Sequence, residues 1–112
     1  MLEKTISEPW YTHVKNSKKI VEGRLYDSKL EDQLKIDPII KFWNNDKTEF
    51  VIVQVLKLTT YLTFEEMLNT EGLDNVLPNV ETIKEGIAIY REYYSDEEEM
   101  ERNVLAISLK KL

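Results

Sequence analysis

The residues best suited to chemistry lie near the start of the chain, in the stretch SKKIVEGR at residues 17–24. Glu22 and Arg24 are two positions apart, and side chains two apart on a strand share a face, so the two can pair or contact one ligand together. Lys19 would face the other way on a regular strand. A site that uses all three residues therefore requires Lys19 to lie before regular strand geometry begins. On spacing alone, an ordinary surface strand with scattered charges is the simpler interpretation.

The inventory of reactive side chains is short. The chain has no cysteine and one histidine, His13. This excludes disulfides, iron–sulfur clusters, thiolate zinc sites and cysteine nucleophiles, as well as multi-histidine metal sites. We therefore expect neither a metal nor a cofactor, and we interpret His13 as a structural residue.

Charge is unevenly distributed along the sequence. The net charge is −6, which argues against a general coat for nucleic acids, because such binding depends on a basic surface. Residues 14–29 nevertheless hold five basic and two acidic residues, a local charge of +3. Residues 65–101 hold twelve acidic and two basic residues, a local charge of −10. An anionic ligand should therefore meet the first third of the chain.

Size and composition predict one compact domain over residues 1–112. The chain has 112 residues, of which 42% are hydrophobic and 32% charged, as in ordinary globular proteins. No stretch approaches the roughly 20 apolar residues of a membrane-spanning helix, and the first ten residues lack the order of a signal peptide. We expect a soluble cytoplasmic protein without a membrane partner.

The hydrophobic pattern predicts a mixed order of helices and strands. We expect a short helix over about residues 8–16, a strand over 19–26, a polar connection over 27–37, and strands over 38–43 and 49–60, the last with both faces buried. Thr63 and Gly72 bound a further helix, and an apolar stripe indicates another over 81–94. A short acidic turn and a strand over 104–109 complete an α+β fold with a curled, mostly antiparallel sheet.

The chain resembles the ASCH family, a branch of the PUA-like β-barrel superfamily. The family pattern is Gly-x-Lys-x-x-Glu-x-Arg, which this chain matches at Lys19, Glu22 and Arg24, with Ser17 in place of the glycine. Further matches follow in order: EPW at 8–10, EGRLYD at 22–27, FEEML at 64–68, EGL at 71–73, VLP at 76–78, EGIAIY at 85–90 and YYS at 93–95. The resemblance implies a small, mostly antiparallel β-barrel with flanking helices. It also implies a cleft beside the motif strand that binds RNA or nucleotides.

Each motif residue has a role that suits such a ligand. Arg24 could grip a phosphate or a base edge with two hydrogen bonds, and Lys19 could supply a compact cation. Glu22 could accept a hydrogen bond from a base amino group or orient Arg24. Tyr26 directly follows the motif strand and is the preferred candidate for stacking on a base, ahead of Trp10. Three further tyrosines, at 90, 93 and 94, fit a packing stripe between helix and barrel.

Some members of the family are amidohydrolases that act on N4-acetylcytidine, and others have been proposed to be ribonucleases. The resemblance places Lys19 at the amidohydrolase lysine and Glu71 at its glutamate. The family threonine position holds Glu22, however, and a carboxylate cannot replace a hydroxyl nucleophile without a change of mechanism. An enzyme that uses Lys19 and Glu71 is therefore an alternative to a binding domain.

A third interpretation is a protein-interaction module. The acidic helical face at residues 81–101 could meet a basic partner weakly, with the cleft unused. We expect Glu97, Glu98 and Glu99 to be solvated, since consecutive acidic residues on a helix point in different directions.

Overall fold

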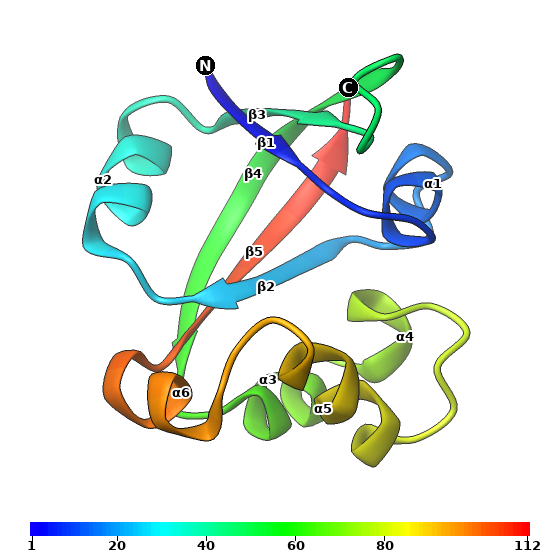
Figure 1. The fold of residues 1–112 in the computed structure, drawn as a ribbon. Coiled ribbons are helices and arrows are strands. Elements are labelled where there is room, and N and C mark those ends of the chain that lie inside the picture. The colour runs from blue at the N-terminus through cyan, green and yellow to red at the C-terminus, as the bar shows by residue number, and fades with distance from the viewer.

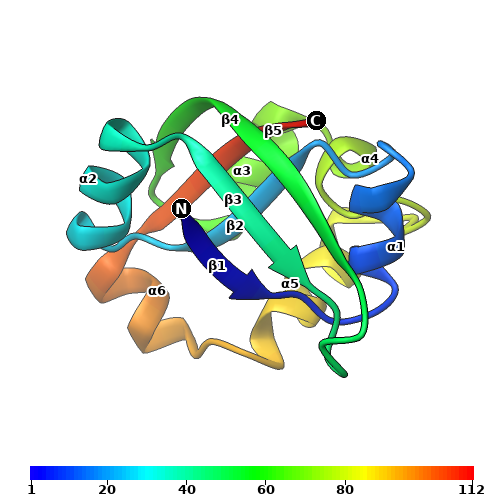
Figure 2. The ribbon, with the colours of Figure 1, turned by 90° about the horizontal axis from the view of Figure 1, so that it is seen from above.

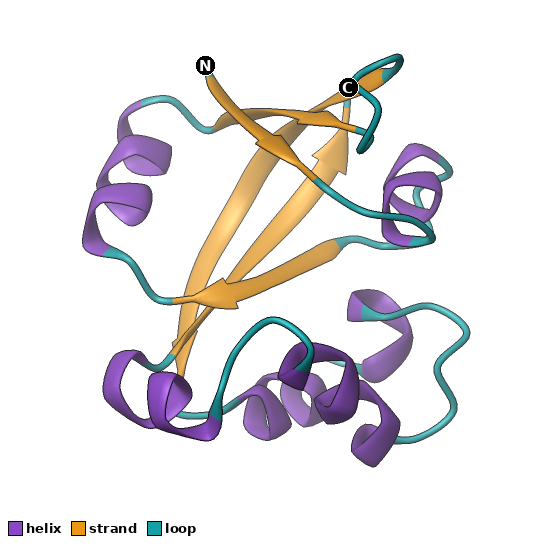
Figure 3. Cartoon of the chain, viewed as in Figure 1, coloured by secondary structure: helices purple, strands orange, loops and turns teal.

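The computed structural model describes residues 1–112, which form five strands and six helices (Figures 1 and 3). In chain order these are β1 Leu2–Thr5, α1 Trp10–Lys15, β2 Val21–Leu25, α2 Ser28–Ile36, β3 Ile39–Trp43, β4 Phe50–Tyr61, α3 Phe64–Glu71, α4 Leu73–Val76, α5 Ile83–Arg91, α6 Asp96–Arg102 and β5 Val104–Lys111. No helix has the length and apolar character needed to cross a membrane.

The strands form one curled sheet in the order β1-β3-β4-β5-β2 (Figure 2). All neighbours are antiparallel except β1 and β3, which run parallel. The 12-residue strand β4 pairs with β3 along its first half and with β5 along most of its length, and its register shifts between Val55 and Lys57. Such an irregularity bends a strand and increases its twist. The sheet is thus a half-barrel with β1 and β2 at its edges, which confirms the predicted α+β fold.

Two apolar cores hold the helices against the sheet. The first lies inside the curl, where Tyr11 and Val14 of α1 and Leu34 of α2 pack against inward-facing residues of the strands. The second lies between the sheet and the helices that gather below β2 in Figure 1. There Phe64 of α3 stacks on Tyr90 of α5 with ring centroids 4.1 Å apart. The second core therefore fixes α5 beside the strand that carries the motif.

The polar segment expected as a connection over 27–37 is in fact the helix α2. Asp27 caps it by accepting hydrogen bonds from the backbone N–H groups of Lys29 and Leu30. Leu30 and Leu34, four positions apart, supply the apolar face that packs against the first core. Strand β1 was not expected either, and it pairs with β3 nearly forty positions further along the chain.

Three other expectations differ in extent. The helix expected over 81–94 ends at Arg91, and the expected acidic turn is the helix α6, which Ser95 begins with a capping box. In β4, Val51 and Val53 are buried, whereas Phe50 is 51% exposed, so the first half of this strand buries only one face. The reason is that no helix covers the outer face of the sheet at this end (Figure 2).

Candidate ligand-binding pocket

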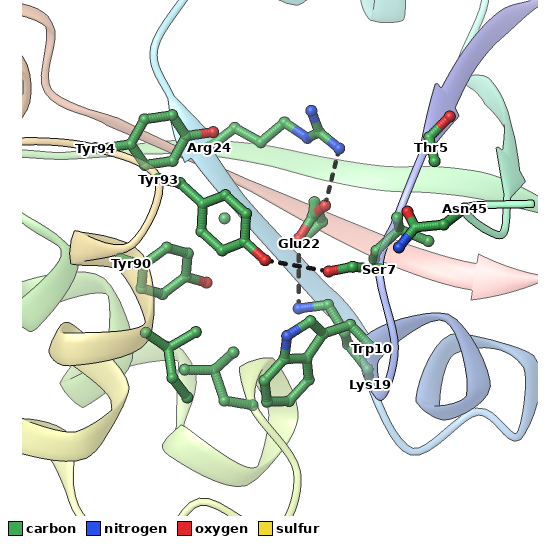
Figure 4. Close-up of a pocket in the computed structure, with 14 residues that line it drawn as sticks. Thr5, Ser7, Trp10, Lys19, Glu22, Arg24, Asn45, Tyr90, Tyr93 and Tyr94 are labelled. Atoms are coloured by element: carbon green, nitrogen blue, oxygen red, sulfur yellow. Dashed lines mark hydrogen bonds and ion pairs between the residues drawn. The ribbon is translucent and has the colours of Figure 1, made fainter.

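A pocket of about 350 Å³ lies between the two edge strands of the half-barrel and the end of α5 (Figure 4). One wall comes from Thr5 and the residues that follow β1, and the opposite wall comes from the tyrosines at the end of α5. The face of β2 that carries Glu22 and Arg24 forms the back. The pocket therefore fills the gap where β1 and β2 do not close the barrel by hydrogen bonds.

Lys19 anchors a buried network of charges behind this pocket. Its Nζ donates to the carbonyl oxygens of Val21 and Val76 at 2.8 and 2.6 Å, and it lies 3.4 Å from Oε1 of Glu22. An ammonium has three donors, and these acceptors occupy all three. Burial lowers the pKa of Lys19, while the carboxylate of Glu22 raises it. With a side chain only 1% exposed, Lys19 fixes Glu22 and offers no free donor to a ligand.

Glu22 and Arg24 share one face of β2, as the two-residue spacing predicts. Nη2 of Arg24 donates to Oε2 of Glu22 at 3.2 Å (Figure 4). The carboxylate is 10% exposed and the guanidinium side chain 23% exposed. Because the guanidinium has five N–H donors, most remain free for a ligand. Arg24 is thus the cation of the network that a ligand can reach.

The turn after α1 places Lys19 outside the regular strand. Ser17 adopts a φ of 60°, in the left-handed region that favours glycine. This is the position at which the family pattern has glycine, so the geometry explains that preference. The backbone N–H groups of Lys18 and Lys19 both donate to the carbonyl of His13. Lys19 therefore lies two positions before β2 begins, which is the condition for it to reach Glu22.

Aromatic side chains contribute to both walls of the pocket. Trp10, Tyr90, Tyr93 and Tyr94 all line the pocket. Tyr90 is 6% exposed, and its buried hydroxyl has no hydrogen-bond partner. Burial raises the pKa of Tyr90 well above its ordinary value, so the hydroxyl stays protonated. The hydroxyl is therefore an unsatisfied donor packed against β2 at the edge of the pocket, with no surface exposed to solvent.

One side-chain contact links the two walls of the pocket. The hydroxyl of Tyr93 lies 3.1 Å from Oγ of Ser7 and joins the end of α5 to the segment after β1 (Figure 4). On the opposite side, Gly23 lets Tyr90 pack directly against β2, because a Cβ at Gly23 would lie 2.7 Å from the Tyr90 hydroxyl oxygen. The absence of a side chain at this position therefore shapes the pocket.

The structure brings Lys19, Glu22 and Arg24 together but places the other two candidate residues elsewhere. The hydroxyl of Tyr26 donates to Oε1 of Glu31 at 3.0 Å, and its ring packs against the first core. Because β2 ends at Leu25, the alternation of the strand does not carry Tyr26 into the pocket. Glu71 ends α3 and accepts a hydrogen bond from Tyr61, outside the pocket. The geometry therefore does not pair Glu71 with Lys19.

Sequence reasoning assigned Tyr90, Tyr93 and Tyr94, at the end of α5 and just after it, to packing and missed their place at the pocket. Phe64 stacks on both Tyr90 and Tyr94, so the packing role exists as well. The signal in the sequence was the cluster of three tyrosines at the end of the apolar stripe. Side chains at the end of a helix can extend beyond the core that the helix covers. Thr5 and Asn45 were also missed, since nothing local predicts that the chain brings them to β2.

The acidic helical face is less exposed than expected. Glu99 is 7% exposed and accepts hydrogen bonds from the backbone N–H of Phe64 and from Nη2 of Arg91, both at 2.7 Å. Glu98 completes the capping box of α6 through the backbone N–H of Ser95. Both carboxylates therefore have a role within the fold, which corrects the expectation that Glu99 is solvated.

The comparisons with known proteins agree with this architecture. The model of the ASCH domain family matches residues 5–112. The chain belongs to the ASCH domain family. Among solved structures, the hypothetical protein PH0355 is 35% identical, with a TM-score of 0.83 over 99% of this chain and 98% of that one. Protein PF0455 from Pyrococcus furiosus is 38% identical, with a TM-score of 0.75 over 99% of this chain and 96% of that one. No curated protein matches this ASCH domain.

Proposed function

We propose that this ASCH domain binds RNA or a nucleotide, with one nucleotide seated in the pocket between β1, β2 and α5. The observation that carries the proposal is the position of Arg24, a partly exposed guanidinium held by Glu22 and facing an aromatic wall across the pocket. A guanidinium binds phosphate oxygens or base edges through paired hydrogen bonds. Aromatic rings stack on bases of any sequence.

The size and charge of the pocket favour a small anion over a long polymer. A volume of about 350 Å³ falls within the usual range of small-molecule sites, about 300–1,000 Å³. With Lys19 protonated, its charge and those of Glu22 and Arg24 sum to +1, which suits a single phosphate.

Within this proposal the three motif residues have different roles. Arg24 contacts the ligand, and Glu22 can accept a hydrogen bond from a base amino or imino group. Lys19 acts as a positioning residue, because its three donors already hold two carbonyl groups and Glu22. The motif therefore combines a buried cation that fixes a carboxylate with an accessible cation that meets the ligand.

No geometric observation favours the amidohydrolase over the binding domain. A lysine that acts as base or nucleophile needs a free lone pair, whereas the amino group of Lys19 faces two carbonyl groups and a carboxylate. Glu71, its expected partner, is hydrogen-bonded to Tyr61 outside the pocket. We therefore advance binding alone.

The proposal is tested by calorimetric titration of the four nucleoside monophosphates into three proteins. These are the wild type, Arg24→Ala and the matched control Arg102→Ala, which removes an exposed arginine on α6 away from the pocket. We expect Arg24→Ala to weaken binding about tenfold or more, because a hydrogen bond to a charged group contributes about 1.5–3 kcal/mol. Arg102→Ala should leave the affinity unchanged. Equal affinities for the wild type and Arg24→Ala would show that these nucleotides do not bind in the pocket as proposed.

A further inference from the structure

A second group of aromatic side chains lies on the outer face of the sheet. Trp43 ends β3 and is the register partner of Phe50, which begins β4. Their rings meet edge to face with centroids 5.2 Å apart. Phe50 is 51% exposed and Trp43 is partly buried, so it is mainly the ring of Phe50 that faces solvent. We refer to Lys41, Trp43 and Phe50 as the Trp43 surface.

A lysine without an ion-pair partner accompanies these rings. Nζ of Lys41 lies 4.3 Å from the centroid of Trp43 and 4.1 Å from that of Phe50. Glu3 is the register partner of Lys41 on β1, but its carboxylate accepts a hydrogen bond from Nε1 of Trp43 at 2.8 Å and forms no ion pair with Lys41. The indole is thereby fixed in orientation, and the charge of Lys41 stays available to an anion.

The Trp43 surface adjoins the pocket. Thr5 lines the pocket and is the register partner of Trp43, so their side chains share one face of neighbouring strands. Asn45, in the turn two positions after Trp43, lines the pocket as well. The backbones of Thr5 and Trp43 lie one strand spacing apart, about 4.8 Å. A chain that leaves the pocket over Thr5 therefore meets these rings directly.

We propose that the Trp43 surface binds a second nucleotide of a single-stranded RNA whose neighbouring nucleotide occupies the pocket. A base stacks on the exposed ring of Phe50, and Lys41 contacts the phosphate that links the two nucleotides. Exposed aromatic rings with an adjacent cation are the usual means of binding single strands without regard to sequence. This inference rests on the proposed function, and it extends the ligand from one nucleotide to a strand of at least two nucleotides.

The test compares nucleoside monophosphates with ribopentanucleotides of the same base, titrated into wild type, Phe50→Ala and Phe50→Tyr. We expect the wild type to bind the pentanucleotide more tightly than the monophosphate. Phe50→Ala should weaken binding of the pentanucleotide about tenfold, because it removes the ring on which the second base stacks. Its affinity for the monophosphate should not change. Phe50→Tyr keeps the ring and should keep the affinity. Leu56→Ala, which removes another exposed apolar side chain of β4, should change neither affinity.

The outcomes separate this inference from the function on which it rests. If the pentanucleotide binds no more tightly than the monophosphate, or if Phe50→Ala leaves its affinity unchanged, the second site is wrong while the pocket stands. If the wild type binds neither probe, the proposed function is wrong and the second site fails with it. Unchanged monophosphate affinity of Phe50→Ala shows that this variant is folded.

Discussion

At the scale of single residues, the buried ammonium of Lys19 is the feature on which the site depends. A buried charge is tolerated only when partners replace the water it has lost. Here two backbone carbonyl groups and Glu22 do so, and Glu22 in turn accepts from Arg24. The same contacts that stabilise Lys19 therefore set the position of the carboxylate and, through it, of the guanidinium that a ligand can reach.

Replacing Lys19 by methionine should destabilise the fold strongly. The change leaves two carbonyl oxygens without their donor and Glu22 without one of its two cations, and breaking a buried pair in this way removes about 3–5 kcal/mol. Urea denaturation measures the free energy of unfolding. Lys18→Met is the matched control, because Lys18 is exposed and makes no ion pair, and it should change stability by less than about 0.5 kcal/mol. Equal stability of the two variants would show that Lys19 is not held as described.

At the scale of elements, the sequence correctly predicted features that depend on residues close together in the chain. The two-residue spacing of Glu22 and Arg24 correctly predicted that they share a face and pair, because alternation is local to β2. The same alternation would extend to Tyr26, but β2 ends at Leu25. Resemblance to the family supplied what spacing could not, namely that Lys19 belongs to the same site.

Elements whose stability comes from distant partners were missed. Strand β1 has four residues and acquires its pairing from β3 far along the chain, so no local pattern marks it. Helix α2 did carry local signals, Asp27 as its cap and Leu30 and Leu34 four positions apart. Its otherwise polar composition outweighed them. The wall of the pocket at the end of α5 was missed for the same reason as β1, because only tertiary packing brings the end of α5 to β2.

The contact between Tyr61 and Glu71 joins the last residue of β4 to the last residue of α3. Burial is the larger cause, and the hydrogen bond to Glu71 the next, of a pKa of Tyr61 that is raised to about 12. A pKa raised above that of the unfolded chain means that the stabilisation is complete below about pH 10 and is lost as the pH rises towards 12.

Tyr61→Phe should therefore isolate this contribution. We expect the difference in free energy of unfolding between wild type and Tyr61→Phe to fall by about 1–2 kcal/mol between pH 9 and pH 11.5. Denaturation by urea at a series of pH values measures it, and the difference removes the effects of other titrating groups. A difference that does not change over this interval would show that the hydroxyl of Tyr61 is not buried and hydrogen-bonded to Glu71 in solution.

At the scale of the whole molecule, the net charge of −6 limits how much of a nucleic acid the domain can hold. The proposed contacts with phosphates are two, that of Arg24 in the pocket and that of Lys41 on the Trp43 surface. For single strands the logarithm of the binding constant falls with the logarithm of salt concentration by about 0.7 per phosphate contact, so two contacts predict a slope of about −1.4.

Affinity for a ribopentanucleotide, measured between 50 and 300 mM salt, tests this limit. The affinity for a homopolymer of about 20 nucleotides should depend on salt with nearly the same slope, because the acidic helices repel the remainder of the strand. A slope several times steeper for the longer strand would reveal an extensive phosphate-binding surface, in conflict with the net charge of −6 and the acidic helices.

The most direct test of the pocket is its response to a ligand, residue by residue. In a ¹H–¹⁵N NMR titration with nucleoside monophosphates, we predict the largest chemical-shift changes at the backbone amides of Gly23, Arg24 and Tyr94 and at the indole N–H of Trp10. The amides of α2 and of α6, which lie outside the pocket, should stay unchanged. Changes centred on those helices, or none at millimolar ligand, would contradict the claim that this pocket binds a nucleotide.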